Sequence, residues 1–187
     1  MPQRTRRGPA VAVAPETREP HVRGTGESMA EIDDIYSTRL FELASDIPRS
    51  ARLPAPDATA TAHSKLCGST ITVDLKVDGD RVSDFGQTVK ACLLGQASAA
   101  VLGREIVGSS ADELRQIAAE MRRMLKESGA PPTGRWADLA MLQPVKDYKA
   151  RHTSTLLVFE AVERALAEIE SKRAGVAAND TPARHNL

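Results

Sequence analysis

The sequence LCGSTITVDLKVDGDRVSDFGQTVKAC, residues 66–92, decides the fold of this chain. Apolar and polar residues alternate over residues 70–77, which predicts a half-buried strand, and Asp-Gly-Asp at residues 78–80 supplies a turn. A second, less regular alternation returns toward residue 92, so the stretch predicts an antiparallel hairpin. The two cysteines of the chain, Cys67 and Cys92, stand at its ends. Thiols at the two ends of a hairpin can meet in space.

The rest of the chain adds one weak strand and several helices. Residues 58–63 form the weak strand, after an extended, proline-containing connection over residues 48–57. Helical spacing of apolar residues predicts a helix before Pro48 and more helices after Cys92, one of them opened by a capping box of Ser110 and Glu113. The predicted helices cover residues 30–47, a small-residue segment after residue 92, residues 111–128, residues 136–142 and residues 153–174. This order predicts an α+β fold, a small three-stranded antiparallel sheet packed on one side by helices.

Composition narrows the possible partners and compartments. Among 187 residues, 41% are hydrophobic and 3% aromatic, which suits one domain. The charges of the 25 basic and 25 acidic residues cancel, so the chain has no net charge that would attract nucleic acid or a membrane surface. No apolar run approaches the roughly 18 residues that span a bilayer, and the first residues lack the apolar core of a signal peptide. We expect a soluble, cytoplasmic protein with no nucleic-acid or membrane partner.

Three regions follow from the patterning. Residues 1–28 combine arginine, glutamate and proline with few large apolar residues, so we expect a disordered N-terminal extension. Residues 29–173 form the folded domain, and Met29 is a candidate for the true start. Residues 174–187 lose the helical pattern, which predicts a flexible C-terminal tail.

Three possible metal ligands fall at element boundaries: Cys67, Cys92 and His152. Boundaries at one end of a small sheet can converge, and two thiolates with one imidazole suit zinc or iron better than magnesium or calcium. The spacing contains no CxxC or HxxxH pair, so a structural alternative stays open. In that alternative the cysteines are buried small apolar residues and His152 caps a helix at the surface. His63 and Lys90, both at strand ends, are weaker candidates.

A series of short motifs resembles the NifU/IscU-type iron–sulfur cluster assembly scaffold family, including its SufU-like members. The resemblance covers about residues 30 to 172. The order in which the motifs occur is more specific for the family than any single motif. The motifs are Pro48-Arg49, Leu66-Cys67-Gly68-Ser69, Val77-Asp78-Gly79-Asp80-Arg81-Val82, Lys90-Ala91-Cys92 followed by Ser98-Ala99, and Pro144-Val145-Lys146 before His152.

The resemblance implies a metal site that departs from the family pattern. Members of the family hold a nascent [2Fe–2S] cluster, or zinc when isolated, on three cysteines with help from an aspartate and sometimes a histidine. Cys67 and Cys92 match the first two cysteines. Ser69 stands in place of the aspartate, and Thr153 in place of the third cysteine. The chain is therefore a divergent member in which His152 is the remaining third protein ligand.

The implied function is that of a scaffold and not of an enzyme. It binds iron or a nascent [2Fe–2S] cluster, receives sulfur from a cysteine desulfurase, and passes the cluster to acceptor proteins. Two alternatives stay open because an aspartate and a cysteine are missing. One is a degenerate paralogue that binds zinc or regulates a desulfurase by protein contact, and the other is a sulfur relay between Cys67 and Cys92.

Overall fold

The computed structural model describes residues 38–179. The N-terminal extension predicted at residues 1–28 lies outside these residues, as do residues 30–37 of the first predicted helix. Residues 180–187 of the predicted tail lie outside them as well. The described elements, in chain order, are α2 Thr38–Ser45, β1 Ala58–His63, β2 Thr70–Asp78, β3 Arg81–Lys90, α3 Leu93–Glu105, α4 Ala111–Glu127, the 3-10 helix η1 Gly134–Asp147 and α5 Lys149–Asn179.

The predicted hairpin and the weak first strand are both present in one sheet. Strands β2 and β3 pair antiparallel with Asp78 opposite Arg81, and β1 adds to the other side of β2 with His63 opposite Thr70. The sheet order is β1-β2-β3. Gly79 in the hairpin turn has a φ of +61°, the left-handed conformation that glycine adopts at least cost. The α+β prediction with a three-stranded antiparallel sheet is confirmed.

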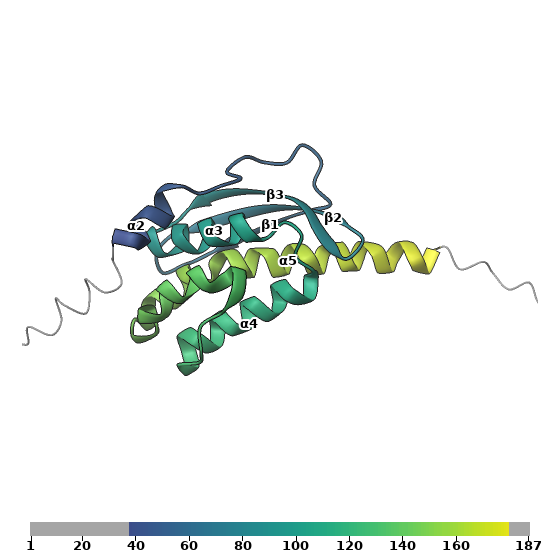
Figure 1. The fold of residues 1–187 in the computed structure, drawn as a ribbon. Coiled ribbons are helices and arrows are strands. Elements are labelled where there is room, and N and C mark those ends of the chain that lie inside the picture. Colours follow the sequence, from purple (N-terminus) through teal and green to yellow (C-terminus); the bar gives the residue numbers. More distant parts are fainter. Residues whose placement is uncertain (1–37, 180–187) are drawn as a thin grey trace, which may run out of the picture.

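The helices gather on one face of the sheet (Figure 1), where α5 runs beneath the strands and α4 lies farthest from them. Ile71, Val73 and Leu75 point toward these helices and are fully buried, while the polar residues between them in β2 point to the other face. Helix α5 contacts β1 and β2, and α3 contacts β3. The alternation in β2 therefore selects the face that forms the core.

The face of the sheet away from the helices is partly covered by the connection between α2 and β1, residues 46–57. Asp74, with no exposed surface, is the anchor of this cover. Its carboxylate accepts hydrogen bonds from the Arg52 guanidinium at 2.5 and 2.9 Å, from the Leu53 backbone N–H at 3.0 Å and from the Thr59 hydroxyl at 2.6 Å. The backbone N–H of Gln87 donates to the Arg49 carbonyl at 2.9 Å, which covers the free edge of β3.

Two helix boundaries differ from the sequence prediction. The short helix expected at residues 136–142 is a longer 3-10 helix that contains Pro144, which lacks the N–H that an α-helix needs. Helix α5 begins at Lys149 and not at Thr153, and it continues past Ala174 to Asn179. No helix within residues 38–179 is long and apolar enough to cross a membrane.

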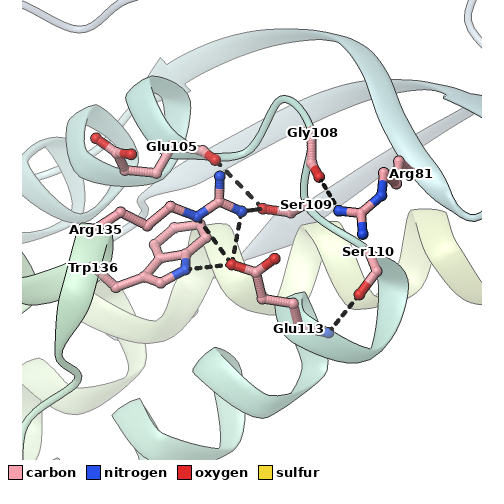
Figure 2. A network of polar contacts seen from close by, with 8 residues as sticks. All are labelled: Arg81, Glu105, Gly108, Ser109, Ser110, Glu113, Arg135 and Trp136. Atoms are coloured by element: carbon pink, nitrogen blue, oxygen red, sulfur yellow. Dashed lines mark hydrogen bonds and ion pairs between the residues drawn. The ribbon is translucent and has the colours of Figure 1, made fainter.

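A polar network joins the start of α4 to η1 (Figure 2). The predicted capping contact is present, since the Glu113 backbone N–H donates to the Ser110 hydroxyl at 3.2 Å. The Glu113 carboxylate accepts the indole N–H of Trp136 at 2.9 Å and the Arg135 guanidinium at 2.6 Å. Burial raises the pKa of Glu113, but the hydrogen bonds from Trp136 and Arg135 outweigh it, so the pKa lies below the usual range. The network fixes η1 against α4.

Replacement of Glu113 by glutamine is expected to lower the free energy of unfolding by about 1 kcal/mol. The amide still accepts from Trp136, but the charge-assisted contact with Arg135 is lost, and partial exposure of that ion pair limits its contribution. Urea unfolding at pH 7 measures the effect, with Glu120→Gln, on the same helix but outside this network, as the control. Equal stabilities of the two variants would contradict a structural role for this network.

Candidate functional site: the thiol site

The first predicted ligand, Cys67, lies on the six-residue loop between β1 and β2. The loop is closed at its base, where the Ser64 backbone N–H donates to the Ser69 carbonyl at 2.8 Å. Gly68 has a φ of +71°, so glycine allows the reversal next to the cysteine. Cys67 is exposed and its neighbour Leu66 is 74% exposed. The loop therefore presents a thiol to solvent beside an exposed apolar side chain.

Three buried serines lie near the Cys67 thiol. Its Sγ lies 3.4 Å from the Ser64 hydroxyl and 2.9 Å from the Ser69 hydroxyl. The Ser154 side chain, from α5, makes a smaller contribution to lowering the pKa of this thiol. Ser64, Ser69 and Ser154 are 1%, 4% and 1% exposed. We call Cys67, Cys92 and these three serines the thiol site.

Cys92 enters the thiol site through Ser69. The backbone N–H of Cys92 donates to the Ser69 hydroxyl at 3.3 Å, and the same hydroxyl contacts Cys67. Cys92 occupies the N-cap position of α3, where its carbonyl accepts the first helical hydrogen bond from Gln96. It is only partly buried. The structure thus brings the two predicted cysteines to one end of the sheet, on either side of Ser69.

Close packing of α3 on α5 places Ser154 in the thiol site. A Cβ at Gly95, one turn into α3, would lie 2.8 Å from the Ala91 Cβ and 3.1 Å from the Ser154 carbonyl oxygen. Glycine at this position therefore lets α3 lie close both to Ala91 and to the α5 backbone. The helix predicted in the small-residue segment after residue 92 thus packs close to a neighbouring backbone.

The hydroxyl groups around Cys67 change its acidity. Hydrogen bonds with Ser64 and Ser69 lower the pKa of the Cys67 thiol to about 7, against a smaller opposing effect of burial. The thiolate is the form that attacks sulfur or binds metal, and a lowered pKa favours it. Cys67 therefore combines solvent exposure with a surrounding that favours the thiolate.

His152, the third predicted ligand, lies on another side of α5. Residues two apart on an α-helix are separated by about 200° around its axis, so when Ser154 faces Cys67, His152 faces away. The His152 Nε2 lies 3.1 and 3.0 Å from the carbonyl oxygens of Val145 and Lys146 and must donate to them, because carbonyls only accept. With Thr153 it lines a surface cavity formed by Arg122, Lys126, Leu156 and Glu160.

The residues present do not make a three-ligand metal site. Within residues 38–179, no three histidine, cysteine, aspartate or glutamate side chains are grouped so that they could hold a metal ion. The two cysteines share the thiol site, and the residue that α5 contributes to it is Ser154. His152 as the third ligand stays a prediction that this geometry does not favour. His63 instead contacts the Thr70 hydroxyl, 2.9 Å from its Nδ1.

Residues 36–155 match the family model described as NifU-like N terminal domain. The chain belongs to this family. The crystal structure of a nitrogen-fixing NifU-like protein (N-terminal) from Brucella abortus is similar, with 54% sequence identity, a TM-score of 0.75, and coverage of 76% of this chain and 99% of that chain. The predicted resemblance to NifU/IscU-type scaffolds is thereby confirmed.

Two curated relatives also match the NifU-like domain. The iron-sulfur cluster assembly scaffold protein IscU of Thermotoga maritima is 26% identical over 137 residues, which cover 72% of this chain and 94% of the relative. The zinc-dependent sulfurtransferase SufU of Bacillus subtilis is 23% identical over 141 residues, or 75% of this chain and 95% of the relative. The relatives thus include both a scaffold and a sulfurtransferase.

Sequence reasoning found both cysteines of this NifU-like domain but missed Ser64 and Ser154. The alignment of motifs placed Thr153 at the position of the third cysteine, whereas Thr153 is exposed and Ser154 is buried beside Cys67. The signal that could have found Ser154 is its position in the buried stripe of α5, in register with the apolar residues that follow. Leu157, Val158 and Ala161, which lie three, four and seven residues after Ser154, are buried on the same face of α5.

Proposed function

We propose that this NifU-like protein acts in iron–sulfur cluster assembly as a carrier of sulfur, with Cys67 as the residue that accepts it. One observation carries the proposal: the Cys67 thiol is exposed on a closed loop and contacts the hydroxyls of Ser64 and Ser69. The family relation supplies the process, since the relatives are named as a cluster assembly scaffold and a sulfurtransferase.

The chemistry is a transfer of sulfane sulfur without net oxidation. The donor is a persulfide of a cysteine desulfurase, and the Cys67 thiolate attacks its outer sulfur. The sulfur–sulfur bond of the donor breaks, the donor cysteine leaves as a thiolate, and a persulfide forms on Cys67. The serine hydroxyls near the Cys67 sulfur, those of Ser64, Ser69 and Ser154, can donate hydrogen bonds to negative charge on the thiolate or the persulfide.

The exposed Leu66 beside Cys67 supports transfer of the sulfur from one protein to another. A persulfide donor has to bring its own cysteine to the acceptor thiol, and an apolar side chain that is 74% exposed offers contact area at that point. Cys92, only partly buried, is the second thiol of the site and the candidate for the next sulfur position. Iron–sulfur acceptor proteins are the proposed final partners.

The test is to detect the persulfide on the full chain after incubation with a cysteine desulfurase and L-cysteine. Mass spectrometry of peptides should find one added sulfur atom on Cys67 in the wild-type protein and in Cys92→Ser, and none in Cys67→Ser. Cys92→Ser is the matched control because it keeps the serines around Cys67. A wild-type protein without persulfide would refute the proposal and leave regulation of a desulfurase by contact. Persulfide on Cys92 alone would refute Cys67 as the residue that accepts the sulfur.

A further inference from the structure

The thiol site lacks one anionic ligand at a defined place. Cys67 contacts the hydroxyls of Ser64 and Ser69, and Ser69 also accepts from the backbone N–H of Cys92. Gly95, three residues after Cys92 in α3, packs on the backbone of Ser154, which places Ser154 at the α5 side of this site. Zinc and cluster iron are bound in proteins by thiolates, imidazoles and carboxylates, whereas a serine hydroxyl stays protonated near neutral pH and is a weak neutral donor. The α5 side of the site therefore contributes an oxygen where a metal needs a charged ligand.

No other side chain of the thiol site compensates for Ser154. Within the described residues no third histidine, cysteine, aspartate or glutamate joins the two cysteines, and the His152 Nε2 is committed to two carbonyls. Ser154 is held in place, since its hydroxyl donates to the Arg151 carbonyl at 3.0 Å and its backbone packs on Gly95. The site is closed on the side of α5.

The solvent side of the thiol site is open. Cys67 is exposed, and the loop that carries it projects Leu66 into solvent. A thiolate from another molecule can therefore approach Cys67 without displacing any buried group. Such a thiolate would supply the third charge that the chain lacks.

We infer that Ser154 occupies the third ligand position of this NifU-like domain, so that a metal ion or cluster is retained only when a thiol of another molecule completes the pair Cys67 and Cys92. This inference rests on the thiol site described for the proposed function. It assigns to the metal a ligand set shared between two molecules. Thr153 and His152 have no part in it.

The experiment is a zinc titration of the full, reduced apoprotein in competition with a chromophoric chelator, without added thiol. Wild type should bind weakly, and Ser154→Cys should bind one equivalent at least about 100-fold more tightly, since a direct ligand is worth more than the roughly 10–100-fold of a second-shell partner. Thr153→Cys, one residue away but exposed, is the matched control and should bind like wild type, as should His152→Ala.

The second arm supplies the external thiol to the wild-type protein. Glutathione should tighten zinc binding, and Cys67→Ser or Cys92→Ser should abolish that gain. If the thiol comes from a second copy instead, zinc should produce a dimer in size-exclusion chromatography that Cys67→Ser removes. This arm decides the inference even if Ser154→Cys does not fold, which circular dichroism and thermal melting would reveal.

Three results would overturn the inference or part of it. One is tight, stoichiometric zinc binding by wild type without thiol that His152→Ala abolishes, and another is equal tightening by Thr153→Cys and Ser154→Cys. Failure of both thiol sources to strengthen binding would also overturn the shared ligand set. None of these results depends on persulfide formation at Cys67, so the proposed sulfur transfer stands or fails separately.

Discussion

Replacement of Gly95 by valine should lower the free energy of unfolding by about 3 kcal/mol, the upper end of the usual cost of overpacking. A Cβ at this position already lies 2.8 Å from the Ala91 Cβ and 3.1 Å from the Ser154 carbonyl oxygen, closer than ordinary van der Waals contact. Neither neighbour is a flexible side-chain end that can move aside. Relief of the clash has to move α3 away from Ala91, which precedes it, and from the α5 backbone at Ser154.

The separation should be visible in the thiol site as well as in stability. Cys92 caps α3 and Ser154 belongs to α5, so moving the helices apart moves Cys92 away from Ser154. We expect slower persulfide formation on Cys67 together with the loss of stability. Urea unfolding and the persulfide assay measure the two effects. Gly175→Val is the control. Gly175 also lies within an α-helix, and no atom lies within 4 Å of the position that its Cβ would take.

An unchanged stability of Gly95→Val, with Gly175→Val also unchanged, would mean that the two helices can separate at no cost. The positioning of Ser154 by α3 would then be wrong. A loss of stability in both variants alike would assign the effect to helix propensity and not to the contact of α3 with α5.

Replacement of Asp74 by asparagine should also lower the free energy of unfolding by about 3 kcal/mol at pH 7. Hydrogen bonds to a charged group contribute about 1.5–3 kcal/mol each, and an amide can no longer accept from the Arg52 guanidinium, the Leu53 N–H and the Thr59 hydroxyl together. The exposure of Arg52 keeps the loss below the sum of these contacts. The connection over residues 46–57 would lose its anchor on the sheet.

The contribution of Asp74 to the free energy of unfolding should decrease as the pH falls. Burial raises the pKa of its carboxyl, but hydrogen bonds from Arg52, Thr59 and Leu53 outweigh burial, so the pKa is lowered from its usual value. A carboxyl with a lowered pKa stabilises the fold above the unfolded pKa of about 3.9 and loses that contribution as the pH falls through the folded value.

Urea unfolding of wild type and Asp74→Asn at several pH values tests this sign. The difference between them should be full at pH 5 to 7 and shrink below about pH 4. Glu168→Gln, which removes an exposed i,i+4 pair with Lys172, is the control and should change stability little at any pH. A difference that grows in acid would contradict the assignment.

Much of this NifU-like fold follows from local pattern. The alternation of residues 70–77, the Asp-Gly-Asp turn and the capping box of Ser110 and Glu113 predict elements that the structure contains at those positions. These signals are readable because each depends on neighbours a few residues away. Both cysteines could be singled out for the same reason, since Cys67 and Cys92 lie in the connections within three residues of a strand end.

The third contribution to the thiol site depends on how α5 is rotated about its axis. Helix α5 was expected from Thr153, and the structure begins it at Lys149, so His152 also lies within the helix. Because each step along a helix turns the side chain by about 100°, the three consecutive residues His152, Thr153 and Ser154 face different directions, and the packing of α5 selects the one that faces the thiol site. Sequence motifs carry no information on this rotation.

The sequence by itself determined the elements, their order, the family and the two thiols of this protein. Only the tertiary structure decided that Ser154, and not His152, reaches Cys67. The physical reason is that α5 is oriented by packing of α3 through Gly95 and of the sheet through β1 and β2, contacts between residues far apart in the chain. The chemistry of the thiol site is set by that packing.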